Sequence, residues 1–233
     1  MTATKRNQVY IPSIDDFRKK FLTYTKQAFE KLPKIRKPRL LDVGCGTGVT
    51  TMKIAKYMNG KIIGLDVDKK ALKELREKIS KKVLDNRIKI INDSFIETGF
   101  LANSFDIIWA EGVFHIIGYN KCLQESYRIL TQNGFLVIVD TLENLKKNSE
   151  KFRKVGFKIY DQINWDENSW WIKYYKPMEA KINELKQKNI DPSLFTHLIE
   201  HEHEIDMVKK DPKKFDCAHL ILQKINKKRK RYE

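Results

Sequence analysis

The stretch LLDVGCGTG at residues 40–48 decides the fold, because an apolar run passes directly into three closely spaced glycines and then into an amphipathic segment. Gly44, Gly46 and Gly48 let the backbone take positive φ angles and let a ligand approach without Cβ atoms in the way. A helix that begins after Gly48 points its first amide groups at the same place. The stretch therefore predicts a strand, a ligand-cradling turn and a helix in succession.

A second stretch, IIGLDVD at 62–68, predicts a buried strand that ends in an acid. Asp66 lies close to the spacing at which a doubly wound fold presents a carboxylate to ribose hydroxyls. The glycines follow the pattern G-x-G-x-G, whereas the dinucleotide fingerprint G-x-G-x-x-G uses its third glycine to bring a helix close beside a pyrophosphate. The two stretches together indicate a nucleoside ligand without a pyrophosphate.

Short apolar runs alternate with amphipathic stretches along the rest of the chain, which implies parallel strands joined by right-handed crossovers. Apolar residues from Ile14 to Lys31 recur with a helical period, and Pro33 and Pro38 separate this helix from the first strand. The segment 166–211 is too long for a simple crossover and predicts a helical insertion. The predicted strands lie near residues 39–43, 61–66, 87–92, 105–110, 134–141, 156–164 and 215–224.

With the glycine turn and Asp66 in place, the chain resembles the class I S-adenosylmethionine-dependent methyltransferases, whose first motif looks like LDVGCGTG and whose second strand ends like GLDVD. ILTQNGFLVIVDT at 129–141 and FDCAHLILQK at 215–224 are similar to the family's fifth strand and to its final antiparallel strand. WAEGVFHIIG at 109–118 and NSWWIKYYKP at 168–177 resemble the small prokaryotic enzymes of the type 11, UbiE-like group.

The resemblance covers the chain from Arg39 to Lys224 and implies its organisation. The expected fold is α/β, with a Rossmann-like, doubly wound sheet of seven strands that is parallel except for the last strand. An N-terminal helical lid over residues 1–38 precedes the methyltransferase domain at 39–225. The insertion at 166–211 is expected to cap the substrate, and residues 226–233 form a basic tail.

The cofactor implied by the resemblance is S-adenosyl-L-methionine, with S-adenosyl-L-homocysteine as the product. Asp93 and Ser94 match the family's acid motif at the adenine edge, although an Asx turn that caps the next helix explains Ser94 equally well and Asp93 less well. The residues expected to bind the cofactor are Asp42, Gly44, Cys45, Gly46, Gly48, Asp66, Val67, Asp93, Ser94 and Glu111.

The fourth strand is followed by the two expected catalytic residues, Glu111 and His115, which in the family lie nearest the methyl group. The apolar run before Glu111 predicts a desolvated carboxyl with a raised pKa, suited to orient or deprotonate the acceptor. His115 titrates near neutrality and is the alternate base, while a packing histidine between Phe114 and Ile116 is the other interpretation.

Aromatic residues supply the expected walls of the acceptor pocket: Tyr10, because the N-terminal segment of the family folds over the cofactor, and Trp171 and Tyr174 in the insertion. Trp170 is expected to seal the core. Aromatic rings also stabilise a cationic sulfonium. The reaction is expected to be an in-line displacement that requires an oriented nucleophile and removal of a proton.

The stretch after the fourth strand lacks the Asn/Asp-Pro-Pro-aromatic motif of enzymes that methylate exocyclic amines of bases, and it lacks the Pro-Cys of cytosine C5 enzymes. A small-molecule acceptor is therefore expected, and its reacting atom is left open, as is the oligomeric state. The net charge of +16 and the tail KINKKRKRYE at 224–233 favour an alternative, an RNA-directed enzyme or nucleic-acid-binding module. Solvated helix faces such as KKALKELREKISKK at 69–82 account for much of this charge, and a protein acceptor is a further alternative.

Three widely spaced cysteines without a CxxC pair indicate a reducing, cytoplasmic setting. The N-terminus has no apolar segment of the kind that directs secretion, and no apolar run approaches about 18 residues, so no membrane span is expected. HLIEH at 197–201, with His203 nearby, fits an H-x-x-E-H zinc motif on one helix. No separate domain completes a third ligand, and no metal is expected.

Overall fold

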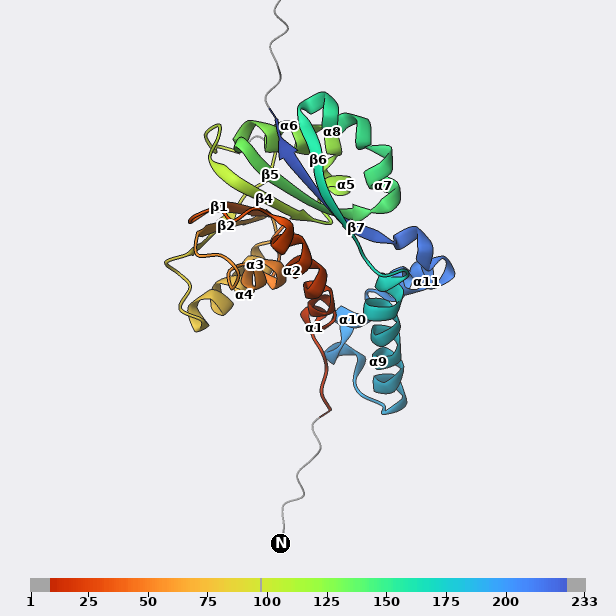
Figure 1. Ribbon diagram of the computed structural model, residues 1–233. Helices are drawn as coiled ribbons and strands as arrows, with labels where there is room; N and C mark the ends of the chain where they lie inside the picture. The colour runs from red at the N-terminus through yellow and green to blue at the C-terminus, as the bar shows by residue number, and fades with distance from the viewer. Residues whose placement is uncertain (1–8, 97, 226–233) are drawn as a thin grey trace, which may run out of the picture.

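The computed structural model describes residues 9–96 and 98–225, and its centre is a seven-stranded sheet with the order β3-β2-β1-β4-β5-β7-β6 (Figure 1). All strands run parallel except β7, which pairs antiparallel with both of its neighbours, β5 and β6. This is the predicted sheet. The strands are β1 (Arg39–Val43), β2 (Lys61–Asp66), β3 (Ile88–Asn92), β4 (Phe105–Glu111), β5 (Leu130–Thr141), β6 (Phe157–Asn164) and β7 (Cys217–Lys224).

Helices cover both faces of the sheet (Figure 1). One face carries α2 (Leu22–Lys31), α3 (Val49–Ile54) and α4 (Lys69–Lys81), whose leucines and isoleucines pack on Trp109, Val137 and Ile221. The other face carries α5 (Phe114–Ile117), α6 (Tyr119–Ile129), α7 (Leu142–Lys147) and α8 (Ser149–Val155). The buried strands are apolar on both sides because both faces are covered.

A third apolar cluster joins the N-terminal helix to the insertion and to the ends of β5 and β7. The N-terminal helix predicted over 14–31 is present as α1 (Ile14–Arg18), a 3₁₀ turn η1 (Lys19–Phe21) and α2. It packs on the helical insertion, and Figure 1 shows α1, α9, α10 and α11 gathered at one end of the molecule. The insertion contains the π-helical turn η2 (Trp170–Tyr175), α9 (Lys176–Gln187), η3 (Pro192–Leu194), α10 (Thr196–Ile199) and α11 (Glu202–Lys210), and η4 (Pro212–Phe215) follows it.

The HLIEH motif does not lie on one helix, and this corrects the sequence interpretation. Helix α10 ends at Ile199 and α11 begins at Glu202, so the chain bends between His197 and His201. His197 Nε2 lies 2.9 Å from the Pro12 carbonyl, and His201 Nδ1 lies 2.8 Å from Glu204 Oε2. Over residues 9–96 and 98–225, no group of three or more His, Cys, Asp or Glu side chains is arranged to hold a metal.

The three cysteines, Cys45, Cys122 and Cys217, are unpaired and buried. Among the described residues, no helix combines the length and apolar character needed to cross a membrane. The predicted basic tail, 226–233, lies outside the described residues.

Candidate functional site

The glycine turn after β1 is tied to the end of β2. Gly44 N and Cys45 N donate to the Leu65 carbonyl at 2.8 and 3.1 Å, and Gly46 N donates to Asp66 Oδ2 at 2.7 Å. The glycines Gly44, Gly46 and Gly48 have φ angles of +68°, +51° and +85°. The turn is therefore of the left-handed kind that the glycine spacing predicted.

Side chains pack closely against the turn at Gly44 and Gly48, whereas the space beside Gly46 is open. A Cβ on Gly44 would lie 2.4 Å from Val113 Cγ2, and one on Gly48 would lie 2.1 Å from Leu75 Cδ1. A Cβ on Gly46, or on Gly112 after β4, would meet no atom within 4 Å. The bare backbone at Gly46 and Gly112 thus faces free space, and a nucleoside with an amino-acid tail fits a cradle of this kind.

The Asp66 carboxylate ends β2 at the rim of this cradle. Its Oδ1 accepts from Asp68 N at 2.9 Å while Oδ2 accepts from Gly46 N, and each oxygen keeps a further lone pair for a ribose hydroxyl. The next residue, Val67, is 68% exposed and offers an apolar surface beside the acid. Asn92 at the end of β3 braces this corner, since its Nδ2 donates to the carbonyls of Asp66 and Val67.

Asp93 and Ser94 are exposed and form a turn of their own. Ser94 N donates to Asp93 Oδ1 at 2.8 Å, and Ile96 N donates to Ser94 Oγ at 3.3 Å. The contact of Ser94 with Ile96 is that of a serine turn, whereas the Asp93 carboxylate accepts only from the adjacent residue and forms no Asx turn, and β4, not a helix, is the next element among the described residues. The second carboxylate oxygen of Asp93 accepts no hydrogen bond within the described residues. Asp93 N also donates to the Asp66 carbonyl at 3.2 Å, so the two acids share one corner of the site.

Two of the predicted cofactor residues are buried beneath the turn. Asp42 is 2% exposed, accepts from Thr51 Oγ1 at 2.5 Å, and has its pKa raised to about 8 by burial. Burial likewise raises the pKa of the Cys45 thiol, which rules out a thiolate near neutral pH. These side chains support the turn from below, and the backbone of the turn is what faces the cradle.

The Glu111 carboxylate is surrounded by hydrogen-bond donors and is not enclosed by apolar side chains alone. Trp109 Nε1 donates to Oε1 at 2.7 Å, Thr50 Oγ1 donates to Oε2 at 2.8 Å, and His219 Nε2 lies 3.5 Å from Oε1. Burial on its own raises the pKa of Glu111, but His219, Trp109 and Thr50 outweigh it, and the pKa lies below its ordinary value. The raised pKa predicted from the apolar run is therefore wrong, because strand neighbours and α3 supply donors that the linear sequence does not reveal.

His115 pairs with a buried acid from the neighbouring strand. Its Nδ1 lies 3.2 Å from Oδ2 of Asp140, whose side chain is 1% exposed, while the His115 side chain is 44% exposed. Asp140 also accepts from Tyr119 Oη at 2.8 Å and from Asn144 Nδ2 at 2.8 Å. Burial raises the pKa of Asp140, but the hydrogen bonds from His115, Asn144 and Tyr119 outweigh burial, and the pKa of Asp140 lies below its ordinary value. In turn, the hydrogen bond to Asp140 raises the pKa of His115.

The predicted wall residues are spread over the N-terminal segment and the insertion. Tyr10 is 65% exposed and donates to Asp16 Oδ2 at 2.7 Å. Trp171 is partly buried, with Lys209 Nζ 5.7 Å from its ring centroid. Tyr174 is 2% exposed and packs edge-on against Trp170, so it lies inside the third cluster.

The sequence prediction missed Asp140 and His219. Both could have been found from the rule that ligands bind at the carboxyl ends of parallel strands. Asp140 ends the apolar run of the fifth strand, and His219 lies near the start of an antiparallel strand, which begins at that same edge. Trp165 is a further missed residue, and its Nε1 donates to His219 Nδ1 at 2.9 Å.

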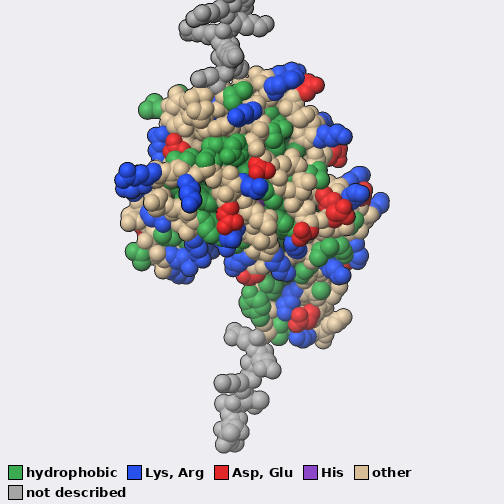
Figure 2. All heavy atoms as spheres, in the orientation of Figure 1, with side chains coloured by type: hydrophobic (Ala, Val, Ile, Leu, Met, Phe, Trp, Pro, Cys, Tyr) green, Lys and Arg blue, Asp and Glu red, His purple; other side chains and the backbone are tan. Residues whose placement is uncertain are grey.

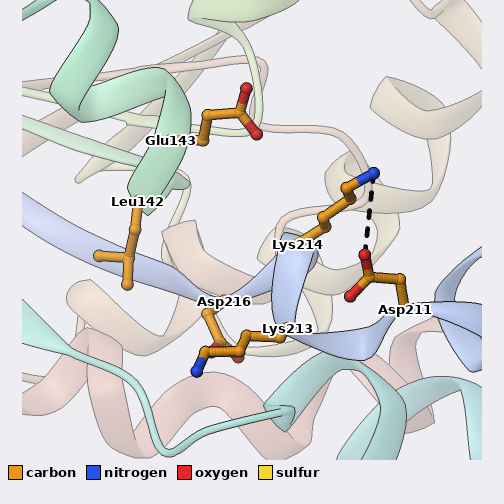
Figure 3. Close-up of a pocket in the computed structure, with 6 residues that line it drawn as sticks. All are labelled: Leu142, Glu143, Asp211, Lys213, Lys214 and Asp216. Carbon is orange, nitrogen blue, oxygen red and sulfur yellow. Dashed lines mark ion pairs between the residues drawn. The ribbon is translucent and has the colours of Figure 1, made fainter.

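A pocket of about 300 Å³ lies between the start of α7 and η4 (Figure 3). Glu143, Asp211, Lys213, Lys214 and Asp216 line it together with Leu142, and Lys214 pairs with Asp211 at 3.7 Å. Its lining mixes both signs of charge, and none of the residues predicted from the sequence to bind or react lines it.

Comparison with protein families decides the identity of this domain. The family model described as a methyltransferase domain matches residues 36–196, which is more than half of the 233-residue chain. The chain belongs to the methyltransferase-domain family. S-adenosylmethionine is the cofactor of this methyltransferase domain, and the glycine turn and Asp66 are the parts of the chain that fit it.

Curated relatives of this methyltransferase-domain protein carry methyltransferase names. The 27-O-demethylrifamycin SV methyltransferase of Amycolatopsis mediterranei is 26% identical over 142 residues, which are 58% of this chain and 52% of the relative. The demethylmenaquinone methyltransferase of Listeria monocytogenes is 32% identical over 155 residues, which are 60% of this chain and 65% of the relative. The chain spans about half the length of the first curated relatives it matches.

Solved structures share the fold at low sequence identity. The [4+2]-cyclase SpnF superposes with a TM-score of 0.72 at 17% identity and covers 86% of this chain and 80% of its own. Phosphoethanolamine N-methyltransferase 2 of Haemonchus contortus, solved with S-adenosyl-L-methionine, gives a TM-score of 0.66 at 17% identity and covers 93% of this chain and 61% of its own. Because one neighbour is named a cyclase, the fold alone does not define the reaction.

Proposed function

We propose that the protein transfers the methyl group of S-adenosylmethionine to a small-molecule acceptor and that His115 removes the acceptor's proton. The observation that carries the proposal is the His115–Asp140 pair at the carboxyl ends of β4 and β5, next to the glycine turn that fits the cofactor. When bound, S-adenosylmethionine supplies a methyl group activated by its sulfonium. The chain must then orient the nucleophile, exclude water and take up one proton.

The Asp140 carboxylate accepts only, because its pKa lies below the ordinary value despite burial and it is therefore ionised near neutral pH. His115 then carries its proton on Nδ1, toward Asp140, and presents the lone pair of Nε2. No other side chain of the described residues hydrogen-bonds to that Nε2. The proton lost by the acceptor goes to Nε2, Asp140 stabilises the resulting imidazolium, and solvent can discharge it because the ring is half exposed.

Glu111 is the weaker candidate for the base. Its oxygens already accept from Trp109 and Thr50, and its lowered pKa makes it a poor proton acceptor at neutral pH. We therefore assign Glu111 to binding and His115 to proton transfer.

The N-terminal helix and the insertion 166–211 are proposed as the lid and cap of the site, with Tyr10 and Trp171 as walls of the acceptor pocket. Tyr174 is proposed only as packing behind them, since 2% of its surface is exposed. The metabolite-like acceptors named for the curated relatives support a small molecule. On the face shown in Figure 2, Lys and Arg side chains are interrupted by acidic and uncharged ones, which gives a nucleic-acid acceptor less support than one continuous basic stripe would.

Calorimetric titration with S-adenosylhomocysteine tests the cofactor assignment, with NAD as the competing ligand class. We expect S-adenosylhomocysteine alone to bind and Asp66→Ala to weaken it about 10- to 100-fold, because a charged acceptor loses its hydrogen bonds to ribose. A panel of alcohols, amines, thiols and RNA with methyl-labelled S-adenosylmethionine then tests the acceptor class. Labelling of RNA alone would contradict the small-molecule proposal.

A further inference from the structure

Glu111 is a carboxylate that no Lys or Arg of the described residues pairs with. Its side chain is 30% exposed, and its closest basic group is His219 at 3.5 Å. No Lys or Arg of the described residues lies within 4 Å of it, although the chain carries a net charge of +16. Two other enclosed carboxylates do pair with a cation: Asp15 with Lys78 at 2.6 Å and Glu125 with Arg128 at 2.7 Å.

His219 does not supply the missing charge. It is fully buried, and its Nδ1 accepts the hydrogen bond from Trp165 Nε1 at 2.9 Å. A ring nitrogen that accepts carries no proton, so the imidazole is uncharged and holds its proton on Nε2. That Nε2 has no hydrogen-bond partner among the described residues and is directed at Glu111. A fully buried N–H donor thus lies 3.5 Å from the carboxylate and has no other acceptor among the described residues.

The sheet places Glu111 on the far side of the glycine turn from Asp66. In the order β3-β2-β1-β4, Asp66 ends β2, the turn follows β1, and Glu111 ends β4. Two strand spacings separate β2 from β4, about 10 Å. A nucleoside whose ribose meets Asp66 and whose tail crosses the turn is directed toward Glu111. Thr50, which contacts Glu111 Oε2, lies in the first turn of the helix that follows the turn.

We propose that Glu111 is the subsite for the ammonium group of the cofactor's amino-acid tail, and that the buried Trp165–His219 pair is the positioning element that holds this carboxylate in place. The inference rests on the proposed function, because it assumes that the cofactor lies across the glycine turn. The side chains that contact Glu111 come from β4, α3 and β7. Thr25 of α2 completes the set, with Oγ1 at 3.4 Å from Glu111 Oε1, so the helix over the site contributes to the subsite as well.

Two ligands separate the ammonium group from the rest of the cofactor. S-adenosylhomocysteine carries the ammonium and no sulfonium charge, whereas 5′-methylthioadenosine keeps the nucleoside and lacks the amino-acid tail. Calorimetry with both ligands is performed on wild type, Glu111→Gln and the control Glu30→Gln, which removes one carboxylate from an exposed pair on α2. We expect Glu111→Gln to weaken S-adenosylhomocysteine about 10- to 100-fold and to leave 5′-methylthioadenosine within about twofold, and Glu30→Gln to change neither.

Two further variants test the positioning role. Trp165→Phe removes the donor to His219 and keeps a ring stacked on Phe21 and Tyr24. Thr50→Val removes one donor to Glu111 at nearly constant volume and keeps the test open if Glu111→Gln fails to fold. Both should weaken S-adenosylhomocysteine about 3- to 10-fold without weakening 5′-methylthioadenosine.

The outcomes are distinct. Equal weakening of both ligands, or no weakening of S-adenosylhomocysteine in any Glu111, Trp165 or Thr50 variant, would overturn the inference. Weakening of S-adenosylmethionine but not of S-adenosylhomocysteine would assign Glu111 to the sulfonium and overturn it also. Failure of wild type to bind S-adenosylhomocysteine would instead contradict the proposed function.

Discussion

Asp15 Oδ1 on α1 accepts a 2.6 Å hydrogen bond from Thr47 Oγ1 in the glycine turn, and this bond ties the N-terminal helix to the candidate site. The other oxygen of Asp15 pairs with Lys78 of α4 at 2.6 Å, and Lys78 donates back to the Thr47 carbonyl at 2.9 Å. Three segments distant in the sequence therefore meet at one carboxylate.

Asp15→Asn should loosen α1 without unfolding the sheet, since it removes a partly buried ion pair worth about 1 kcal/mol. Amide hydrogen exchange over residues 14–18 should become about fivefold faster, while exchange in β1 and β4 stays unchanged. Lys19→Gln, which breaks an exposed pair in the same region, is the matched control. Unchanged exchange in α1 would mean that apolar contacts alone hold this helix.

Gly46 and Gly48 should respond differently to alanine. Both have positive φ angles, so each alanine costs about 1 kcal/mol of backbone strain. Gly48→Ala also drives a Cβ into the buried Leu75, and it should lower the free energy of unfolding by a further 1–3 kcal/mol or so, whereas the Gly46 side is open. Urea unfolding measures the difference, and S-adenosylhomocysteine titration should show that Gly46→Ala loses binding while it stays folded.

Asp42 should make stability depend on pH in a direction unusual for a carboxylate. Burial raises its pKa to about 8 from an ordinary value of 3.8, so the folded protein holds this proton more tightly than the unfolded chain. The stability that Asp42 contributes is present below about pH 4 and is lost as the pH rises toward 8. Asp42→Asn removes this dependence and still accepts from Thr51. Unfolding curves between pH 4 and 9 should therefore shift in favour of the variant as the pH rises; parallel curves would falsify the assignment.

The His115–Asp140 pair should control the acid limb of the methyl-transfer rate. Because Asp140 raises the pKa of His115, the neutral base forms only as the pH rises through that raised value. Asp140→Asn should move the limb to lower pH and reduce the plateau about 10- to 100-fold, and His115→Ala should reduce the rate about 10²- to 10⁴-fold. NMR titration of the imidazole checks the pKa change independently of any acceptor. Tyr119→Phe, which removes another donor to Asp140, should perturb the limb less.

The strands were predictable because their apolar runs have sharp ends. Residues 39–43 and 61–66 match the observed β1 and β2, bounded by Pro38 and Gly60 on one side and by the glycine turn and Asp66 on the other. The fifth strand begins at Leu130, earlier than the predicted Gly134, because Leu130 pairs with Phe105 before a register shift in β4. The sequence did not predict this extension, because turn-forming residues such as Asn133, which has a positive φ angle, interrupt the apolar run.

The positions of the glycine turn and of Asp66 were predictable for the same reason, since both follow strand ends in the sequence. The ionisation of Glu111 was not, because only one donor, Trp109, lies beside it in the sequence, while Thr25, Thr50 and His219 come from α2, α3 and β7, far away along the chain. The burial of Tyr174 was also not predictable, because the spacing of aromatic residues in one helix does not reveal that Tyr174 packs against Phe17 and Phe21 of the N-terminal segment.

The antiparallel direction of β7 has an evolutionary consequence. Strand β6 ends, and β7 begins, at the edge where Glu111 and Asp140 lie, so the whole insertion between them is the loop of one oversized hairpin. Such a loop can lengthen, shorten or be exchanged between paralogues while the seven-stranded frame and the glycine turn stay as they are. With the insertion as the proposed cap of the acceptor, grafting of 166–211 alone would change acceptor preference, and β6, β7 and the Trp165–His219 contact would form the junction.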